Sequence, residues 1–262
     1  MEPSAPSHEV PLIEMRDVSA SSLRDQSTII AEEVNWTVAN SDYWVIAGLQ
    51  GAGKSDFLMM TAGLMAPAVG TYLLLGQKMP IFDEPRLEHR LRLGLVFETG
   101  QLFNHLTVLE NVVLPLRYHY DLSKAEAQER VHELLEVLEL GPWADSTPGA
   151  IGRNWQKRVG LARALALKPE VLLLDNPLGG LDLRHTDWWQ NFLSQLSKGH
   201  SLLDGRKMTL VATAADLRPW KNRARQFAIL REKKFSVLGN WAQLEAASSE
   251  LVEELLPMES HV

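Results

Sequence analysis

The stretch of sequence that decides the fold runs from Gly48 to Ser55 and reads GLQGAGKS. It fits the phosphate-binding loop pattern G-x-x-x-x-G-K-[ST] at every position. Glycines in such a loop let backbone N–H groups curl around phosphate oxygens with no Cβ in the way. Lys54 supplies a positive charge for the phosphates, and Ser55 supplies a hydroxyl for Mg²⁺. The sequence therefore predicts a nucleotide-phosphate site formed by Gly48, Gln50, Gly51, Ala52, Gly53, Lys54, Ser55 and Asp56.

The residues on either side give this loop the setting that the motif requires. Residues 43–47 (YWVIA) are a short apolar run that favours a β-strand, and the residues after the loop predict a helix over 54–65. A strand, a glycine-rich loop and a helix, in that order, make up the phosphate-binding unit. The local pattern and the motif therefore agree.

The rest of the chain alternates between short apolar runs and amphipathic segments. Runs such as VLLL at 171–174 are apolar without alternation, which is typical of parallel strands covered on both faces. Ser123 and Glu126 predict a capping box at the start of one helix. We predict further strands over 10–18, 29–38, 71–75, 93–97, 171–175, 209–213 and 226–230, and helices over 109–118, 123–140, 155–167 and 182–198. A last amphipathic helix is predicted over 241–262, with an apolar stripe of Leu251, Val252, Leu255 and Leu256.

Composition narrows the functional classes. The chain has 262 residues, of which 45% are hydrophobic, which suits one domain or one domain with an insertion. Its net charge of -7 argues against nucleic acid as a partner. It has no cysteine, and its eight histidines lack metal-ligand spacing. No run approaches the ~18 apolar residues of a membrane span, so we expect a cytoplasmic protein that reaches a membrane only through partners.

A second site element is the apolar run Val171–Leu174, which ends in Asp175 and is followed by Asn176. An aspartate at the end of such a strand can hold the Mg²⁺ shell opposite Ser55. Together with GLD at 180–182, this element resembles the ATP-binding subunits of ATP-binding-cassette (ABC) transporters. The resemblance covers residues 10–240 and is strongest in the phosphate loop, in LGLVFETGQLFNHLTVLENVVLPL (93–116) and in KRVGLARALALKPEVLLLDNPLGGLD (157–182).

The resemblance implies an α/β fold of the P-loop NTPase class. This fold has a RecA-like, mostly parallel sheet core, an inserted helical subdomain and an N-terminal antiparallel β subdomain. The resemblance also divides the chain into four parts. These are a first part of the core at 1–97, a helical subdomain at 98–157, a second part of the core at 158–240 and a tail at 241–262. It also implies ATP and Mg²⁺ as ligands, with the metal near Ser55, Asp175 and Glu98.

The same resemblance implies the partners. They are the permease subunits of a transporter, with this chain peripheral on the inner face of the membrane, and a second ATPase subunit. Both a homodimer and a heterodimer stay open. The sequence of residues 100–116 is most similar to the sequences of ATPases from phospholipid transporters that work with mammalian-cell-entry (MCE) lipid-binding proteins. We therefore expect lipid transport, with an MCE-type protein as a candidate partner.

Several family positions carry unusual residues. Asn176 stands where family members have a glutamate that activates the attacking water, and an amide cannot accept that proton. Ala215 stands where they have a histidine that touches the γ-phosphate. Glu98 stands where they have a glutamine that signals the presence of the γ-phosphate to the helical subdomain. Asp56 follows Ser55 where threonine is favoured, and its carboxylate would be repelled by phosphates unless it turns away.

The signature segment and the adenine contact depart as well. The family's L-S-G-G-Q aligns with Ile151–Trp155, which places Arg153 and Asn154 where two glycines let backbone approach phosphate. Arg153 either replaces the lost contacts by its charge or blocks the approach. The aromatic residue that stacks on adenine is expected near Asp25, yet the first aromatic residue in the chain is Trp36.

These departures leave three hypotheses. Loss of one base or donor typically costs ~10²–10⁴ in rate, so the first is a subunit that binds Mg-ATP and hydrolyses it weakly or not at all. The second is an active ATPase in which Glu98 replaces the missing glutamate. The third is a structural or regulatory module that no longer uses nucleotide.

Overall fold

A single mixed β-sheet organises the molecule. The computed structural model describes residues 10–79 and 87–246. Within these residues ten strands pair in the order β5-β4-β1-β2-β10-β9-β3-β8-β7-β6. The strands are β1 (Ile13–Ser21), β2 (Ile29–Val38), β3 (Tyr43–Ala47), β4 (Val69–Leu74), β5 (Gln77–Lys78), β6 (Leu93–Val96), β7 (Val171–Leu174), β8 (Thr209–Ala214), β9 (Gln226–Arg231) and β10 (Lys234–Gly239).

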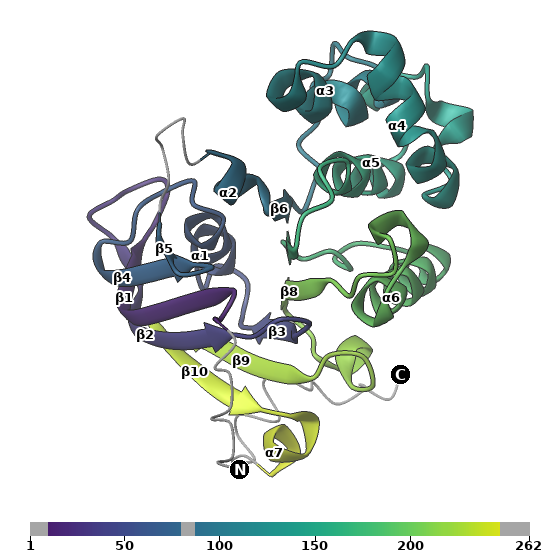
Figure 1. The fold of residues 1–262 in the computed structure, drawn as a ribbon. Helices are drawn as coiled ribbons and strands as arrows, with labels where there is room; N and C mark the ends of the chain where they lie inside the picture. Colours follow the sequence, from purple (N-terminus) through teal and green to yellow (C-terminus); the bar gives the residue numbers. More distant parts are fainter. Residues whose placement is uncertain (1–9, 80–86, 247–262) are drawn as a thin grey trace, which may run out of the picture.

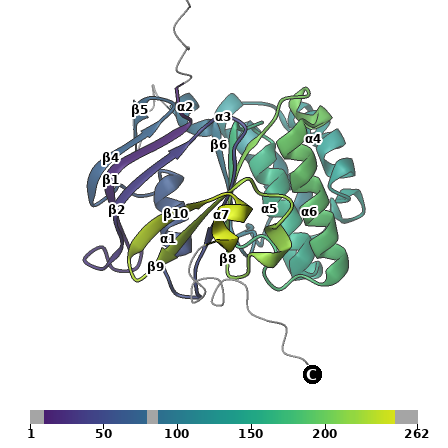
Figure 2. The same ribbon diagram turned by 90° about the horizontal axis from the view of Figure 1, so that it is seen from below.

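The helices lie on both faces of this sheet (Figures 1 and 2). They are α1 (Lys54–Thr61), α2 (Leu87–Leu91), α3 (Val108–Tyr120), α4 (Lys124–Val137), α5 (Arg153–Leu165), α6 (Leu183–Lys198) and α7 (Trp241–Glu245), with short 3-10 turns η2 (Gly141–Trp143), η3 (Pro148–Ala150), η4 (Ser201–Leu203) and η5 (Arg218–Trp220). In Figure 1, α3, α4 and α5 form a helical group at the upper right. None of the helices in the described part is long and apolar enough to cross a membrane.

The centre of the sheet is parallel and buried, as the apolar runs predict. β3 pairs in parallel with β8 and β9, and β7 pairs in parallel with β8 and β6. Successive side chains point to opposite faces of a strand. Leu172 and Leu174 therefore join the core under the helices α3 to α6, while Val171 and Leu173 join the core around α1.

The N-terminal strands form the antiparallel subdomain that the sequence predicts. β1 pairs antiparallel with β2 and β4, and β4 pairs with β5. Trp36 of β2 is buried here, with its ring 5.7 Å from the ring of Trp44, 6.0 Å from Phe57 and 5.5 Å from Phe235. This aromatic cluster fastens the β subdomain to α1 and β10.

Capping interactions set the starts of the helices in the helical group. Thr107 and Glu110 cap α3 with a reciprocal pair of hydrogen bonds, and Ser123 and Glu126 cap α4 in the same way, which confirms the predicted capping box. Buried Asn111 ties the loop before α3 to the helix, because its amide accepts from the Phe103 N–H and donates to the Phe103 carbonyl.

Arg158 of α5 links the helical group to α6. Its guanidinium carbon lies 3.6 Å from the ring centre of Trp188 and 4.6 Å from that of Trp155. Its Nη1 donates to Glu139 Oε2 at 2.8 Å. The side chain is buried, and such cation–π contacts gain strength when they are shielded from water.

The structure differs from the sequence prediction at several element ends. α1 stops at Thr61 instead of residue 65, because Gly63 takes a left-handed conformation (φ 74°) that ends the helix. The sequence did not predict β5 or β10. Only α7 of the predicted 241–262 helix is described, and the stripe of Leu251, Val252, Leu255 and Leu256 lies outside the described residues. α5 runs across the expected boundary at 157/158, so the domain limits stay a prediction.

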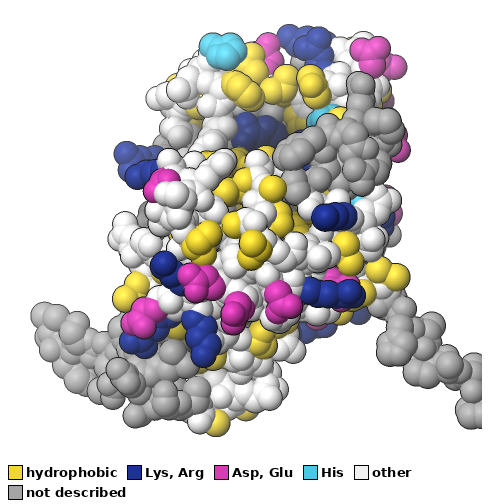
Figure 3. Space-filling view, turned by 90° about the vertical axis from the view of Figure 1, so that its left-hand side faces the viewer, with side chains coloured by type: hydrophobic (Ala, Val, Ile, Leu, Met, Phe, Trp, Pro, Cys, Tyr) yellow, Lys and Arg dark blue, Asp and Glu magenta, His cyan; other side chains and the backbone are white. Residues whose placement is uncertain are grey.

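Figure 3 shows the face on the left-hand side of Figure 1. Hydrophobic side chains gather across its middle, and charged side chains of both signs lie below them. Scattered exposed apolar residues are normal on a protein surface, whereas a continuous group of them points to contact with another molecule.

The strands at the parallel centre are buried along their length. Leu172→Ala removes a fully buried side chain from β7, and we expect it to lower the free energy of unfolding by about 2–5 kcal/mol. The matched control is Leu183→Ala on α6, where the leucine is 78% exposed and the change should stay within about 0.5 kcal/mol. Urea unfolding followed by circular dichroism measures both, and equal losses would contradict this account.

Candidate nucleotide-binding site

The phosphate loop lies between β3, which ends at Ala47, and α1, which begins at Lys54. Two close approaches require glycine. A Cβ on Gly48 would lie 2.5 Å from the Leu230 carbonyl oxygen, and a Cβ on Gly53 would lie 2.8 Å from the Ile30 Cβ. Gly53 also has a left-handed φ of 91°. Residues of β9 and β2 therefore pack against the loop from two sides. This packing requires glycine at both positions whether or not a ligand is bound.

Lys54 points back into the loop. Its ammonium donates hydrogen bonds to the carbonyls of Gly48 at 2.6 Å and Leu49 at 2.8 Å. Burial lowers the pKa of Lys54, and the carboxylates of Asp175 and Glu98 oppose that shift. An ammonium held over a loop of backbone N–H groups is suited to phosphate oxygens.

Ser55 and Asp175 meet across the site, as predicted. Ser55 Oγ donates to Asp175 Oδ1 at 3.0 Å, and Thr213 Oγ1 donates to the same oxygen at 2.9 Å. A hydroxyl and a carboxylate are the oxygen donors that Mg²⁺ prefers. The described residues contain no group of three or more His, Cys, Asp or Glu side chains that would hold a metal. Ser55 and Asp175 fit a Mg²⁺ ion that takes its remaining ligands from phosphate and water, and Glu98, the third residue expected near the metal, lines the same cleft.

A cleft of about 640 Å³ surrounds these groups. Its lining includes eight of the residues predicted to bind nucleotide or metal, which are Gln50, Gly51, Gly53, Lys54, Ser55, Asp56, Glu98 and Asp175, together with Asn176 and Ala215. Gly48 and Ala52 belong to the same loop without lining the cleft. Asp56 is also among the residues that line the cleft.

Part of the cleft is lined by the β1–β2 loop and the start of β2. Ser22, Arg24, Thr28 and Ile30 line it, and none of them is aromatic. The loop is held by Asp25, whose carboxylate accepts from Thr28 Oγ1 at 2.7 Å and from the Ser27 N–H at 3.0 Å. These hydrogen bonds lower the pKa of Asp25. The resemblance implies an adenine-stacking aromatic residue near Asp25, and the residue that lines the cleft there is Arg24.

Asn176 is fixed at the edge of the cleft. Its N–H donates to Thr213 Oγ1 at 2.9 Å, and its carbonyl accepts from Lys157 Nζ at 3.2 Å. Its side-chain amide donates to Glu98 Oε1 at 2.6 Å. The structure therefore brings together Asn176 and Glu98, two of the three residues at family catalytic positions. Thr213 and Lys157 were missed as site residues, because no motif assigns them a role.

The predicted signature segment lies apart from this cleft. None of residues 151–155 lines it. Gly152 is the N-cap of α5, and Arg153, its first residue, is exposed. Asn154 Nδ2 donates to Asp182 Oδ2 at 3.0 Å. Trp155 packs edge-on against His185, with ring centres 5.3 Å apart.

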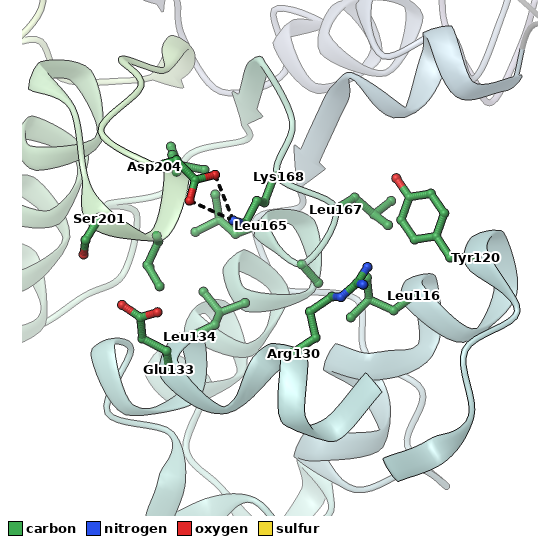
Figure 4. Close-up of a pocket in the computed structure, with 13 residues that line it drawn as sticks. Leu116, Tyr120, Arg130, Glu133, Leu134, Leu165, Leu167, Lys168, Ser201 and Asp204 are labelled. Atoms are coloured by element: carbon green, nitrogen blue, oxygen red, sulfur yellow. Dashed lines mark hydrogen bonds and ion pairs between the residues drawn. The ribbon is translucent and has the colours of Figure 1, made fainter. Parts of the chain in front are cut away.

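A second cavity, of about 390 Å³, lies between α4, the loop after α5 and η4 (Figure 4). Its floor is apolar, and its rim carries charges of both signs. Lys168 Nζ pairs with Asp204 Oδ2 at 3.1 Å, while Arg130 and Glu133 face the same space. It contains no residue of the phosphate loop. It is therefore separate from the nucleotide cleft.

Comparison with known proteins agrees with this geometry. The family described as "ABC transporter" matches residues 31–179. The chain is 32% identical, over 79% of its length and 51% of the relative's, to the spermidine/putrescine import ATP-binding protein PotA of Trichodesmium erythraeum. It is also 32% identical, over 81% of its length and 86% of the relative's, to the probable sulfate/thiosulfate import ATP-binding protein CysA of Chlorella vulgaris.

The fold is also found among solved structures. A dimeric ATP-binding cassette in a post-hydrolysis state with bound ADP and Pi superposes with a TM-score of 0.74 at 27% identity, over 85% of this chain and 95% of that one. This likeness confirms the expected fold, a P-loop NTPase sheet with a helical insertion. The chain spans about half the length of several curated relatives that it matches.

The contact between Ser55 and Asp175 predicts a metal-dependent affinity. Asp175→Asn keeps the shape of the side chain and removes its charge, so ATP binding in Mg²⁺ should weaken by about tenfold to a hundredfold. Binding in EDTA should change little. Asp204→Asn, in the second cavity, is the matched control. Isothermal titration with and without Mg²⁺ checks this, and an unchanged affinity in Mg²⁺ would refute the metal site.

Proposed function

The chain belongs to the ABC transporter family, and on that premise we propose that it is the ATP-binding subunit of such a transporter, binding Mg-ATP and hydrolysing it slowly. The observation that carries this proposal is the junction of Lys54, Ser55 and Asp175 in one cleft, with Ser55 Oγ 3.0 Å from Asp175 Oδ1. A lysine, a hydroxyl and a carboxylate at the edge of a phosphate loop are the groups that grip a metal-bound triphosphate.

Slow hydrolysis is supported by the groups that the cleft lacks. Ala215 offers no donor to a γ-phosphate, and the amide of Asn176 accepts no proton. No histidine lines the cleft. Each missing base or electrostatic donor typically costs ~10²–10⁴ in rate. ATP then favours the closed pair of subunits through its preferential affinity for that state.

The partner subunit follows from the signature segment. Family members work as pairs in which the signature of one subunit faces the phosphate loop of the other. Here Asn154 is engaged by Asp182 and Arg153 replaces a glycine, so two copies of this chain would form two deficient sites. A second, intact ATPase subunit would supply one good signature. A heterodimer is therefore the assembly that we propose, with a homodimer as the alternative.

A second groove, lined by residues of β6, α3 and α5, supports docking to a membrane permease. Its volume is about 640 Å³, and its lining is mostly apolar. It includes Phe97, Phe103 and Tyr118, of which Tyr118 is 78% exposed. An apolar groove with exposed aromatic side chains is typical of a surface that receives a partner helix. The permease would hold this chain at the inner face of the membrane.

The transported molecule is the part of the proposal with two candidates. Lipid or phospholipid transport, with an MCE-type partner, is our interpretation of the sequence of residues 100–116. The names of the relatives favour import of a small solute instead, and they differ among themselves in that solute. The cytoplasmic ATPase acts on ATP in either case, so the two candidates share the same site.

The main test is binding and turnover by the purified chain. We expect ATP binding in Mg²⁺ that Lys54→Ala weakens by about tenfold to a hundredfold. Steady-state turnover should stay below about 0.1 per second, because typical enzymes turn over at ~10 per second and missing groups remove at least ~10². Brisk turnover by the chain alone would favour the fully active ATPase. Absence of ATP binding would favour a structural or regulatory module.

The docking groove predicts a difference between two exposed tyrosines on α3. Tyr118 lines the groove and Tyr120 lines the second cavity. Tyr118→Asp places a charge in the apolar groove and should release the chain from the membrane fraction of its native cells. Tyr120→Asp should leave the chain bound. Fractionation and immunoblotting measure this, and equal behaviour of the two variants would contradict the docking surface.

A further inference from the structure

We propose that Glu98, held by Asn176, is the base that carries the remaining ATP hydrolysis of this chain. The proposal rests on the proposed function, since it assigns a residue of the same cleft. Its basis is the contact between Asn176 Nδ2 and Glu98 Oε1 at 2.6 Å. Family members have a carboxamide at position 98 and a carboxylate at position 176. In this chain the two groups have changed places, so that Glu98 is the carboxylate of this pair.

Elimination among the cleft carboxylates leads to Glu98. Three carboxylates line the cleft, those of Asp56, Glu98 and Asp175. Asp175 is engaged through Oδ1 by the hydroxyls of Ser55 and Thr213 and fits the metal. Asp56 lies in the first turn of α1, directly after the residues that bind phosphate. Glu98 is exposed, follows β6 and faces Asn176, so water reaches it.

Asn176 is held rigidly enough to orient this carboxylate. Its backbone N–H and C=O are bound by Thr213 and Lys157, as described above. Its φ is 43°, a left-handed conformation that asparagine tolerates better than most residues. A Cβ on Gly179 would lie 2.2 Å from Asn176 Nδ2, so Gly179 keeps the space for this amide open. Asn176 therefore acts as a positioning residue for Glu98.

Two ammonium groups interact with the charge of Glu98. Burial lowers the pKa of Lys54 and of Lys157, and the charge of Glu98 opposes that shift in both. Glu98 therefore lies close enough to both lysines for electrostatic attraction.

The reaction step balances with water alone. The water oxygen forms a bond to the γ-phosphorus while the bond between that phosphorus and the β–γ bridging oxygen breaks. The proton of the water passes to the Glu98 carboxylate and from there to solvent. ADP, inorganic phosphate and a proton leave, and nothing is oxidised or reduced. Glu98 contributes by accepting the proton, an effect typically worth ~10²–10⁴ in rate.

The test is single-turnover hydrolysis of γ-labelled ATP by an excess of the purified full-length chain in Mg²⁺. Glu98→Gln should lower the rate constant by at least about tenfold while the ATP dissociation constant changes less than about threefold. Asn176→Ala should lower the maximal rate without changing the half-saturating ATP concentration. The exchange variant Glu98→Gln/Asn176→Glu restores the family arrangement and should recover or exceed the wild-type rate.

Two controls make the result specific. Glu133→Gln, an exposed glutamate in the second cavity, should leave the rate unchanged. Lys54→Ala gives the background. A wild-type rate equal to that background, or a wild-type rate in Glu98→Gln, would overturn the proposal. Recovery of Glu98→Gln by high Mg²⁺ would assign Glu98 to the metal and would overturn it as well.

The two proposals fail in different ways. Loss of the proposed function would appear as a wild-type chain that does not bind ATP. Loss of the inference alone would appear as intact ATP binding with hydrolysis that does not depend on Glu98. Thermal unfolding by circular dichroism, measured for each variant, ensures that a lost rate is not a lost fold.

Discussion

The site depends on one short network of hydrogen bonds at the carboxyl ends of three parallel strands. Ser55 follows β3, Asp175 follows β7, and Thr213 belongs to β8. Asp175 Oδ1 accepts from both hydroxyls, and Thr213 Oγ1 in turn accepts from the Asn176 N–H. Thr213 lies in β8 and Asp175 directly follows β7, so a shift of either strand by one residue would turn its side chain to the opposite face and break the network. The residues that keep the sheet packed therefore also keep the site assembled.

The features of the structure that could be predicted are those determined by short sequence patterns. The phosphate loop, the parallel centre and the capping of α4 at Ser123 each follow from a pattern within about ten residues. The contact between Ser55 and Asp175 was also within reach, because each residue belongs to a recognised motif. The ends of elements were less accessible, and α1 stops early at Gly63 for a reason that depends on its φ.

The unpredicted part arises from contacts between residues far apart in the sequence. β10 alternates too weakly to stand out, and it is a strand because it pairs with β9. Lys157 has no role of its own in the motif at 157–182, yet its ammonium donates hydrogen bonds to the carbonyls of Asn176 and Gly179. Arg158 looks like an ordinary helical charge in the sequence, and its place between two indole rings depends on the packing of α5 against α6.

Gly100 and Gly160 show how finely the helical group is set against the sheet. A Cβ on Gly160 would lie 2.8 Å from the Gly100 Cα, and a Cβ on Gly100 would lie 2.4 Å from the Gln156 carbonyl oxygen. The two backbones touch with no side chain between them. One added methyl group would act as a wedge that tilts α5 and carries Arg153 away from its present position. The close packing of α5 against the segment after β6 therefore requires glycine at both positions, because neither has room for a Cβ.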